Sequence, residues 1–245
     1  MSWFVRAGVA AGLVLGTITS PIAARAASAA IAPNTIYMVT FGGNSTLNRL
    51  SPATGARTLI GNTGAPLTDL SFRGGILNAV SFTKLYVLNP TTGHATTVGR
   101  LGFSDINALV TRPSTGKLYG AGNAAPGRFV SINAKTGHAH QIGTFGTGLG
   151  SAGDLAFVNG TLYATVNRAG FAHTYFAKVS LSTGHATLIA DTGFPNVWGL
   201  TLRSGVLYAA TKNGLFLRIS PTTGRATRIG SNGAAQAGLA TSPRN

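Results

Sequence analysis

A short phrase built on Thr-Gly recurs five times along this chain, and its spacing restricts the possible folds more than any other feature. The glycines of the phrase are Gly55, Gly93, Gly137, Gly184 and Gly224, which are separated by 38, 44, 47 and 40 residues. A repeat of about 40 to 50 residues is typical of one four-stranded blade of a β-propeller. The recurrence therefore predicts an all-β protein assembled from propeller blades.

Each repeat can be divided into four short strands, and the fifth repeat shows this most clearly. Its apolar residues alternate with small or polar residues, as in strands whose two faces have different surroundings. The segments between the strands are rich in Gly, Ser, Asn and Pro, which favour turns. The predicted strands of this repeat are 198–202, 206–210, 215–219 and 225–229.

The other repeats follow the same division, with one difference at the start of the chain. The second, third and fourth repeats span 67–98, 106–142 and 154–189. The first repeat lacks an opening strand, and residues 237–241 near the C-terminus match the missing segment. We therefore expect a five-bladed β-propeller of four-stranded antiparallel blades over residues 34–245. The C-terminal strand is expected to pair with the N-terminal blade and close the ring.

Residues 1–29 have the pattern of a secretory signal peptide. Arg6 supplies a positive charge, residues 7–18 are apolar, and Ala24-Arg25-Ala26 offers a small-x-small cleavage motif, with cleavage after Ala29 as the alternative. A membrane anchor is the other interpretation, but the apolar run is shorter than the ~20 residues that a spanning helix needs. We expect export to the periplasm or the extracellular space, with no transmembrane segment after processing. The chain has no Cys, so disulfides cannot stabilise it there.

The chain is strongly basic. It has 19 Lys and Arg against 4 Asp and Glu, and without Arg6 and Arg25 the balance is 17 minus 4, or +13. Such a charge favours solubility or attraction to anionic surfaces at the cell envelope. The cations are scattered through turns and strands and do not form the blocks typical of nucleic-acid tails, so we expect no specific nucleic-acid partner.

The turns preceding the fourth strands carry a resemblance to a known group of proteins. Ser51-Pro-Ala-Thr-Gly55, Asn89-Pro-Thr-Thr-Gly93 and Ser220-Pro-Thr-Thr-Gly224 stand before strands of the type Ala-Thr-x-Ile-Gly. These repeats resemble the bacterial secreted β-propellers grouped as WD40-like, NHL-like and YVTN proteins. The Trp-Asp dipeptide of WD40 repeats proper is absent. The resemblance implies the propeller fold, and for function it implies a mixture of interaction scaffolds, ligand binders and a few enzymes.

The repeats differ most where the chain enters each first strand, at one end of the central channel, and we expect a ligand site there. Aromatic, amide and carboxylate side chains in such a place suit a polar, ring-shaped ligand such as a sugar. Asp69 and Asp154 share one repeat position, and the alternative for both is that they satisfy backbone donors inside the channel. The candidate ligand-binding residues are Asp69, Phe103, Asp105, Asn107, Phe145, Asp154, Phe194, Asn196, Trp198 and Gln236.

Catalysis is harder to support from the residues present. The chain has no Glu, no Cys and no Ser in a Gly-x-Ser-x-Gly elbow. Calcium is the one cofactor that the residues allow, and lactonase-type propellers hold calcium in their channels. The candidate ligands are Asp69, Asp105, Asn107 and Asp154. His94, His138 and His185 occupy one repeat position in three different blades, so they are expected at the surface and not at a shared metal.

The sequence thus predicts an exported, non-catalytic propeller. We expect it to act as a monomeric interaction or carbohydrate-binding module at the cell envelope, with a glycan or a protein as partner and without a cofactor. The alternative is a calcium-assisted hydrolase or lactonase with a site in the channel. Electrostatic adhesion to anionic surfaces is a third possibility, and it would weaken steeply with salt.

Overall fold

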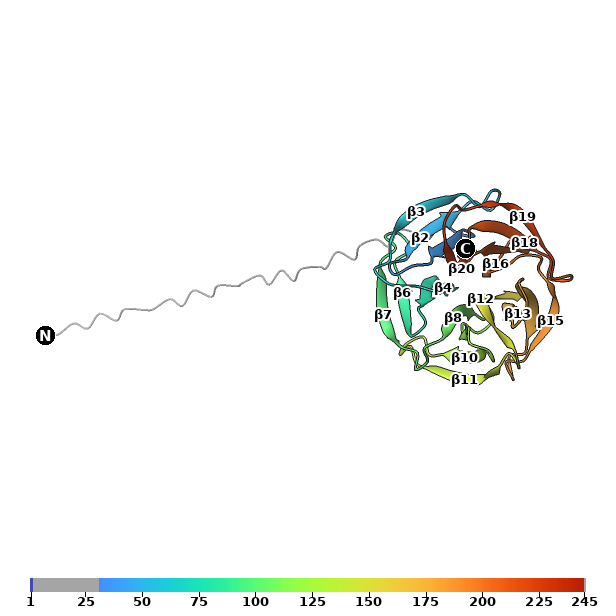
Figure 1. The fold of residues 1–245 in the computed structure, drawn as a ribbon. Helices are drawn as coiled ribbons and strands as arrows, with labels where there is room; N and C mark the ends of the chain where they lie inside the picture. The colour runs from blue at the N-terminus through green and yellow to red at the C-terminus, as the bar shows by residue number, and fades with distance from the viewer. Residues whose placement is uncertain (2–30, 245) are drawn as a thin grey trace. The chain divides into compact units, whose positions relative to one another are not determined.

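The computed structural model describes Met1 and residues 31–244, and residues 31–244 form a five-bladed β-propeller. Five four-stranded antiparallel sheets are arranged around a central channel (Figure 1). The predicted fold class and blade number are confirmed. The predicted signal peptide lies outside the described residues. Within the described part of the chain, no helix has the length and apolar character needed to cross a membrane.

In every blade the strands follow one another from the channel to the outside. Blade 1 has β20 (Gln236–Thr241), β1 (Ile36–Thr40), β2 (Thr46–Leu50) and β3 (Arg57–Asn62), and blade 2 has β4 (Asp69–Arg73), β5 (Ile76–Val80), β6 (Lys84–Leu88) and β7 (Ala95–Arg100). Blade 3 has β8 (Ile106–Thr111), β9 (Leu118–Gly122), β10 (Arg128–Ile132) and β11 (Ala139–Thr144). Blade 4 has β12 (Leu149–Val158), β13 (Thr161–Arg168), β14 (Tyr175–Val179) and β15 (Ala186–Asp191). Blade 5 has β16 (Val197–Arg203), β17 (Val206–Thr211), β18 (Leu215–Ile219) and β19 (Ala226–Ser231).

The chain ends close the ring as the split first repeat predicts. Strand β20 pairs antiparallel with β1, with Met38 opposite Leu239. Beyond the strands, the N–H of Asn34 donates to the carbonyl of Pro243 at 3.2 Å. The hydroxyl of Ser242 accepts from the N–H of Thr35 at 2.8 Å and donates to the carbonyl of Ala32 at 2.7 Å. The inner strand of blade 1 therefore comes from the opposite end of the chain to its other three strands.

The outer strands explain why the Thr-Gly phrase recurs. They follow one another around the circumference, and the N–H of Ala95 at the start of β7 donates to the carbonyl of Thr63 just after β3. A β-carbon on Gly61 in β3 would overlap the carbonyl oxygen of Thr92, the residue before Gly93 in the turn of the next blade. Gly93 has a φ of 83°, which glycine adopts readily. The phrase therefore marks the contact between one blade and the next.

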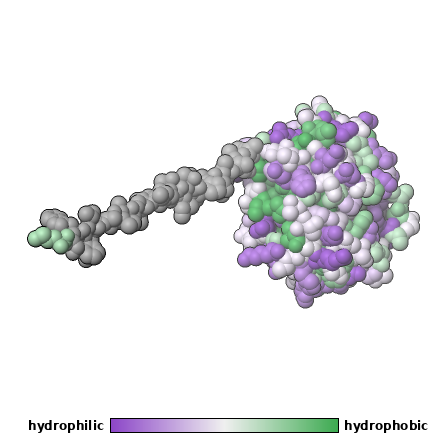
Figure 2. Space-filling view, turned by 90° about the vertical axis from the view of Figure 1, so that its left-hand side faces the viewer, coloured by the Kyte–Doolittle hydropathy of each residue, from purple (hydrophilic) through white to green (hydrophobic). Residues whose placement is uncertain are grey.

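Five hydrophobic clusters fill the spaces between adjacent blades. The cluster between blades 5 and 1, for example, joins Tyr208 and Phe216 to Met38 and Leu239. Tyr208 also stacks on Phe216, with ring centroids 5.4 Å apart. Tyr208 belongs to a Leu-Tyr dipeptide that recurs at 118–119 and 162–163, and its ring packs between blades. On the side of the propeller that Figure 2 shows, hydrophobic residues gather only in small groups among hydrophilic ones.

Blade 4 departs from the expected strand boundaries. Strand β12 begins at Leu149, five residues before the predicted start at Asp154. Its additional residues pair with the extended end of β13, with Leu149 opposite Arg168, and a register shift separates Ser151 from Leu155. The segment consists of small residues, so the alternation that indicates a strand was absent from it.

Removal of residues 236–245 should abolish the cooperative folding transition. Strand β1 would lose its inner partner, and blade 1 would be left with an open sheet edge at the channel. Far-UV circular dichroism with thermal melting measures this. A chain that lacks only residues 244–245 is the matched control and should melt like the intact protein. Addition of a synthetic 234–245 peptide to the truncated chain should restore the transition, and an unchanged melting curve after truncation would contradict the closure.

Candidate functional site

A pair of aspartates occupies the centre of the channel. Asp69 and Asp154 begin or lie within the inner strands of blades 2 and 4, and each stands directly before a leucine. Both side chains are fully buried. Every inner strand has a leucine at the equivalent position, and these are Leu70, Leu109, Leu155, Leu200 and Leu239.

The backbone N–H groups of all five leucines donate to these two carboxyl groups. Asp69 Oδ1 accepts from Leu70 at 2.7 Å, and Asp69 Oδ2 accepts from Leu109 at 2.5 Å. Asp154 Oδ1 accepts from Leu155 at 2.6 Å. Asp154 Oδ2 accepts from Leu200 at 2.6 Å and from Leu239 at 3.2 Å. The pair therefore satisfies one buried donor from each of the five blades. This stabilises the fold, because an unpaired N–H group inside a protein is costly.

The other three blades leave room for the pair by carrying small residues at the same repeat position. Blades 3, 5 and 1 have Ala108, Gly199 and Gly238 where blades 2 and 4 have aspartate. A β-carbon on Gly238 would overlap Asp69 Oδ1. One on Gly199 would overlap the side-chain amide of Gln236. The channel therefore accommodates two carboxyl groups at this level and excludes further side chains.

The surroundings of the pair change its protonation. Burial raises the pKa of Asp69 well above its ordinary value of 3.8, and the negative charge of Asp154 raises it further. Burial also raises the pKa of Asp154, against the opposing effect of its three N–H donors. The pair therefore retains a proton to higher pH than exposed aspartates do. Its geometry is that of the alternative considered above, in which these residues satisfy backbone donors.

The Asp154→Ala substitution should destabilise the protein strongly. It removes the acceptor of three buried N–H groups, and each unpaired donor costs roughly 1–3 kcal/mol, so we expect a loss of about 3–6 kcal/mol in the free energy of unfolding. Asp69→Ala removes two acceptor contacts together with a like charge and should cost less. Urea denaturation measures both. Asp191→Ala at the surface is the control and should change stability by less than about 0.5 kcal/mol.

The pH dependence of stability should also reflect the pair. Because the folded protein holds a proton that unfolded aspartates release near 3.8, this stabilisation is complete below that value and is lost as the pH rises through the raised pKa. The contribution of the pair to the melting temperature should thus decrease from about pH 4 toward neutral pH. The Asp69→Asn variant, whose amide does not titrate, isolates the effect. A difference between the two proteins that does not vary with pH would refute the shared proton.

A cavity of about 250 Å³ opens at the end of the channel where the inner strands begin, and we name it the upper mouth. Its lining comes mainly from two repeat positions. One is the second residue before each inner-strand leucine, and the other lies near the end of the second strand in four of the five blades. The first position contributes Thr68, Asn107, Gly153, Trp198 and Ala237, and the second contributes Phe41, Phe82, Asn123 and Asn167; Ser151, Ala152 and Asn196 complete the lining.

The lining of the upper mouth is divided into an aromatic arc and an amide arc. Trp198, Phe41 and Phe82 come from blades 5, 1 and 2, which are neighbours in the ring. Asn107 and Asn123 come from blade 3, and Asn167 comes from blade 4. A ligand in this cavity would meet apolar ring surfaces on one side and hydrogen-bonding amides on the other.

Two buried polar atoms of the amide arc have no partner among the described residues. Asn107 Nδ2 donates to the carbonyl of Ser151 at 3.2 Å, which fixes the orientation of the amide. Asn107 Oδ1 and Ser151 Oγ are buried and make no hydrogen bond. Both residues line the cavity. Buried polar atoms are normally paired, so these two atoms have unused hydrogen-bonding capacity next to the cavity.

Trp198 offers less free ring surface than its position alone indicates. The ring of Phe41 contacts it edge-on at a centroid distance of 5.2 Å, and Lys212 Nζ lies 4.9 Å from its centroid. Phe41 itself remains 43% exposed. Next to the upper mouth, a hollow of about 400 Å³ between blades 1 and 2 shares Phe41, Thr68 and Phe82 with it. The free aromatic surface is therefore that of the phenylalanines, at the junction of two connected hollows.

The upper mouth brings together Asn107, Asn196 and Trp198 of the predicted ligand-binding residues and leaves the others elsewhere. Phe145 is fully buried in the core between blades 3 and 4, and Phe194 packs in the core between blades 4 and 5. Gln236 is buried and accepts a hydrogen bond from Asn232 Nδ2 at 3.0 Å. These three side chains therefore contribute to the packing and hydrogen bonding of the protein interior and not to the upper mouth.

Phe103 and Asp105 belong to a separate cluster on blade 3. Arg128 Nε donates to Asp105 Oδ1 at 2.9 Å, and the Arg128 guanidinium lies 4.6 Å from the centroid of Phe103. The four residues considered for calcium therefore do not converge. Asp105 is paired with Arg128. Asp69 and Asp154 accept hydrogen bonds from N–H groups, and the positive ends of these donors would repel a metal ion. Across residues 31–244, no three His, Cys, Asp or Glu side chains are grouped as metal ligands.

Four residues of the upper mouth were missed by the sequence analysis, although they share a repeat position. Phe41, Phe82, Asn123 and Asn167 each stand five residues after the Leu or Ile that begins the core of the second strand. An alignment of the five repeats on this Leu or Ile would have shown that the four residues share a position. The loops between second and third strands open at the same end of the channel as the strand entrances, and only the strand entrances were compared between repeats.

Comparison with known proteins places the chain in a family. A family model described as "Repeat of unknown function (DUF6923)" matches residues 106–241, more than half of the chain. The chain belongs to this family. The DUF6923 match begins with β8 and ends with β20, so it covers blades 3 to 5 and the closing strand of blade 1. None of the curated proteins compared with the chain matches it.

Two solved structures are similar in fold. A chain in the crystal structure of a nidogen/laminin complex has a TM-score of 0.58 at 13% sequence identity, with 86% of this chain and 82% of that chain covered. An extracellular domain, BT4673 from B. thetaiotaomicron, described as part of a hybrid two-component system, has a TM-score of 0.45 at 16% identity, with 83% and 28% covered. At these identities the first similarity establishes the propeller fold and nothing about ligands.

Proposed function

We propose that this protein is an exported binding module whose upper mouth takes a neutral carbohydrate. The propeller fold and the repeat family support a binding or interaction module in general. The observation that carries the finer proposal is the division of the upper mouth into an aromatic arc and an amide arc with unpaired Asn107 Oδ1 and Ser151 Oγ. Sugars present apolar ring faces and hydroxyl edges, and they require both kinds of surface.

The size and chemistry of the site favour binding over catalysis. The cavity of about 250 Å³ accommodates one sugar ring, and the adjoining hollow would accept a second. The side chains in the upper mouth are amides, hydroxyls and aromatics, with Lys212 beside Trp198 as the nearby charge. No carboxylate lines this cavity, and glycoside hydrolysis uses two. We do not propose the calcium-assisted hydrolase further, because Asp105 is paired with Arg128 and the carboxyl groups of Asp69 and Asp154 accept five backbone N–H groups.

The signal-peptide pattern of residues 1–29 supports export, with the periplasm or the extracellular space as the site of action, and a chain without Cys is compatible with it. Glycans are abundant there, and a binding module needs no cofactor for such a role. A protein partner is the second candidate, favoured by the similarity to a propeller crystallised in a nidogen/laminin complex. Both partners would use a loop-lined face of the propeller.

Carbohydrate binding can be tested with an array of neutral and acidic oligosaccharides, followed by calorimetric titration of the strongest neutral glycan. Phe41→Ala and Asn107→Ala should each weaken binding about tenfold, which corresponds to about 1.4 kcal/mol. The matched control is Phe171→Ala, since Phe171 is 50% exposed on a blade 4 loop and lies outside the cavity. Its effect should be less than about twofold. Retained affinity in both mouth variants, or binding that disappears at high salt, would contradict the proposal.

A further inference from the structure

The opposite end of the channel contains a second cavity, which we name the lower mouth. It has a volume of about 400 Å³ and lies where the inner strands end. Its floor is formed by the five leucines whose N–H groups hold the aspartate pair. The pair and these leucines separate it from the upper mouth, so a molecule in one cavity cannot contact a molecule in the other. The lower mouth is therefore a distinct place for a ligand.

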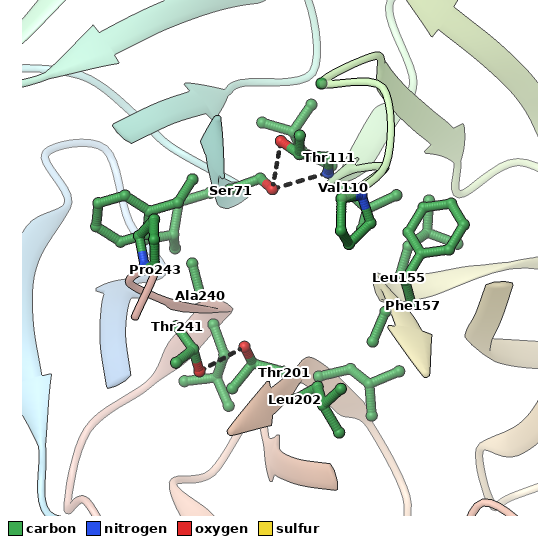
Figure 3. Close-up of a pocket in the computed structure, with 18 of the residues that line it drawn as sticks. Ser71, Val110, Thr111, Leu155, Phe157, Thr201, Leu202, Ala240, Thr241 and Pro243 are labelled. Carbon is green, nitrogen blue, oxygen red and sulfur yellow. Dashed lines mark hydrogen bonds between the residues drawn. The ribbon is translucent and has the colours of Figure 1, made fainter. Parts of the chain in front are cut away.

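The walls of the lower mouth are mostly apolar, with hydroxyl groups at two blade junctions. Ser71 and Thr111 are paired at 3.0 Å between blades 2 and 3, and Thr201 and Thr241 are paired at 2.9 Å between blades 5 and 1. Figure 3 shows these pairs around an open centre, with Leu155 and Phe157 of blade 4 on the side between them. An apolar molecular body would be surrounded here on all sides.

Arginines recur directly beyond this lining. The third residue after the floor leucine is Arg73 in blade 2, Arg112 in blade 3 and Arg203 in blade 5. Each follows a residue that lines the cavity. The Arg73 side chain runs next to Gly116, which also lines the cavity, and its Nε is buried without a hydrogen-bond partner in the described residues. Arg203 Nε donates to the carbonyl of Asn34 at 2.8 Å, which holds this side chain across the junction between blades 5 and 1.

No side-chain carboxylate of the protein neutralises these arginines. The chain has four acidic residues, all within the described part. Asp69 and Asp154 are buried above the cavity floor, Asp105 pairs with Arg128, and Asp191 contacts His173. Three arginines without a carboxylate partner therefore stand directly beyond an apolar interior. This arrangement complements a molecule with an anionic head and an apolar body.

We propose that the lower mouth binds a small amphipathic organic anion, with its apolar body against the channel walls and its charged head among Arg73, Arg112 and Arg203. Guanidinium groups bind carboxylate, phosphate and sulfate heads by paired hydrogen bonds, and the apolar walls select against hydrophilic ions such as inorganic phosphate. The proposal does not depend on carbohydrate binding at the upper mouth, because the two cavities share no lining residue.

Titration calorimetry with octanoate, below its micelle concentration, tests the site in the purified protein. We expect octanoate and octyl sulfate to bind in a one-to-one ratio, while octyl glucoside, octylamine and inorganic phosphate do not. The Arg73→Gln/Arg112→Gln double variant should weaken octanoate binding at least tenfold; Arg203 is kept because it also holds Asn34. The Asn107→Ala variant of the upper mouth should leave octanoate binding unchanged.

The control for net charge is Arg100→Gln/Arg228→Gln, which removes the same number of charges from exposed positions on β7 and β19. Its affinity for octanoate should stay within about twofold of the original. Equal losses in both double variants would show that only the overall field attracts the anion, and equal binding of octyl glucoside would show that the head group is not recognised. Either result, or no octanoate binding, overturns the proposal. Melting curves of each variant establish that it is folded.

Discussion

The structure depends on how the backbone donors inside the channel find acceptors. Five inner strands approach one axis, and each directs the N–H group of a leucine toward it. Two aspartates accept all five, so a symmetric set of donors is satisfied by an asymmetric set of side chains. Small residues stand at the same repeat position in the other three blades, and a β-carbon on Gly238 would overlap Asp69. Burial and the charge of Asp154 raise the pKa of Asp69. The blades are thus joined at their inner ends by charge-assisted hydrogen bonds and at their outer ends by the Thr-Gly contacts.

The aspartate pair also determines what the channel can do. It closes the channel at mid-height and leaves one cavity at each end. The two cavities differ in chemistry because they are lined by different repeat positions. The upper mouth receives residues that vary from blade to blade between aromatic and amide side chains. The lower mouth is lined mainly by apolar and hydroxyl residues, and arginines stand directly beyond this lining in three blades. One repeated frame therefore presents two cavities of unlike chemistry.

The positions of the four acidic residues explain why the surface of the protein is basic. Two of the four, Asp69 and Asp154, accept backbone N–H groups at the channel axis. The other two form ion pairs or hydrogen bonds with Arg128 and His173. Almost all Lys and Arg side chains of residues 31–244 therefore have no carboxylate partner. Their positive charge remains at the protein surface. A surface of this kind resists self-association through repulsion and attracts anionic molecules.

Several features could be predicted from the sequence because they depend on local patterns that recur. The period of the Thr-Gly phrase indicated the blades, and the unmatched segment at residues 237–241 indicated ring closure. The candidate site was predicted only in part. Asn107, Asn196 and Trp198 reach the upper mouth, whereas Phe145 and Gln236 are buried. Phe145 packs in the core between blades 3 and 4, and such a contact between blades is not recorded in the local pattern of the sequence. Phe41 and Phe82 join the site from loops that are distant in the sequence.

The sequence by itself determined the number of blades, their four-stranded composition and the pairing of the two chain ends, since strand alternation and turn residues act within a few residues of one another. Only the tertiary structure decided the roles of Asp69 and Asp154, which the sequence left open between ligand contact and donor satisfaction. Their partners lie on inner strands of other blades, up to 85 residues away, and no local pattern records which N–H groups will meet at the axis. The same reason applies to both cavities, whose walls are assembled from two to five residues of each blade.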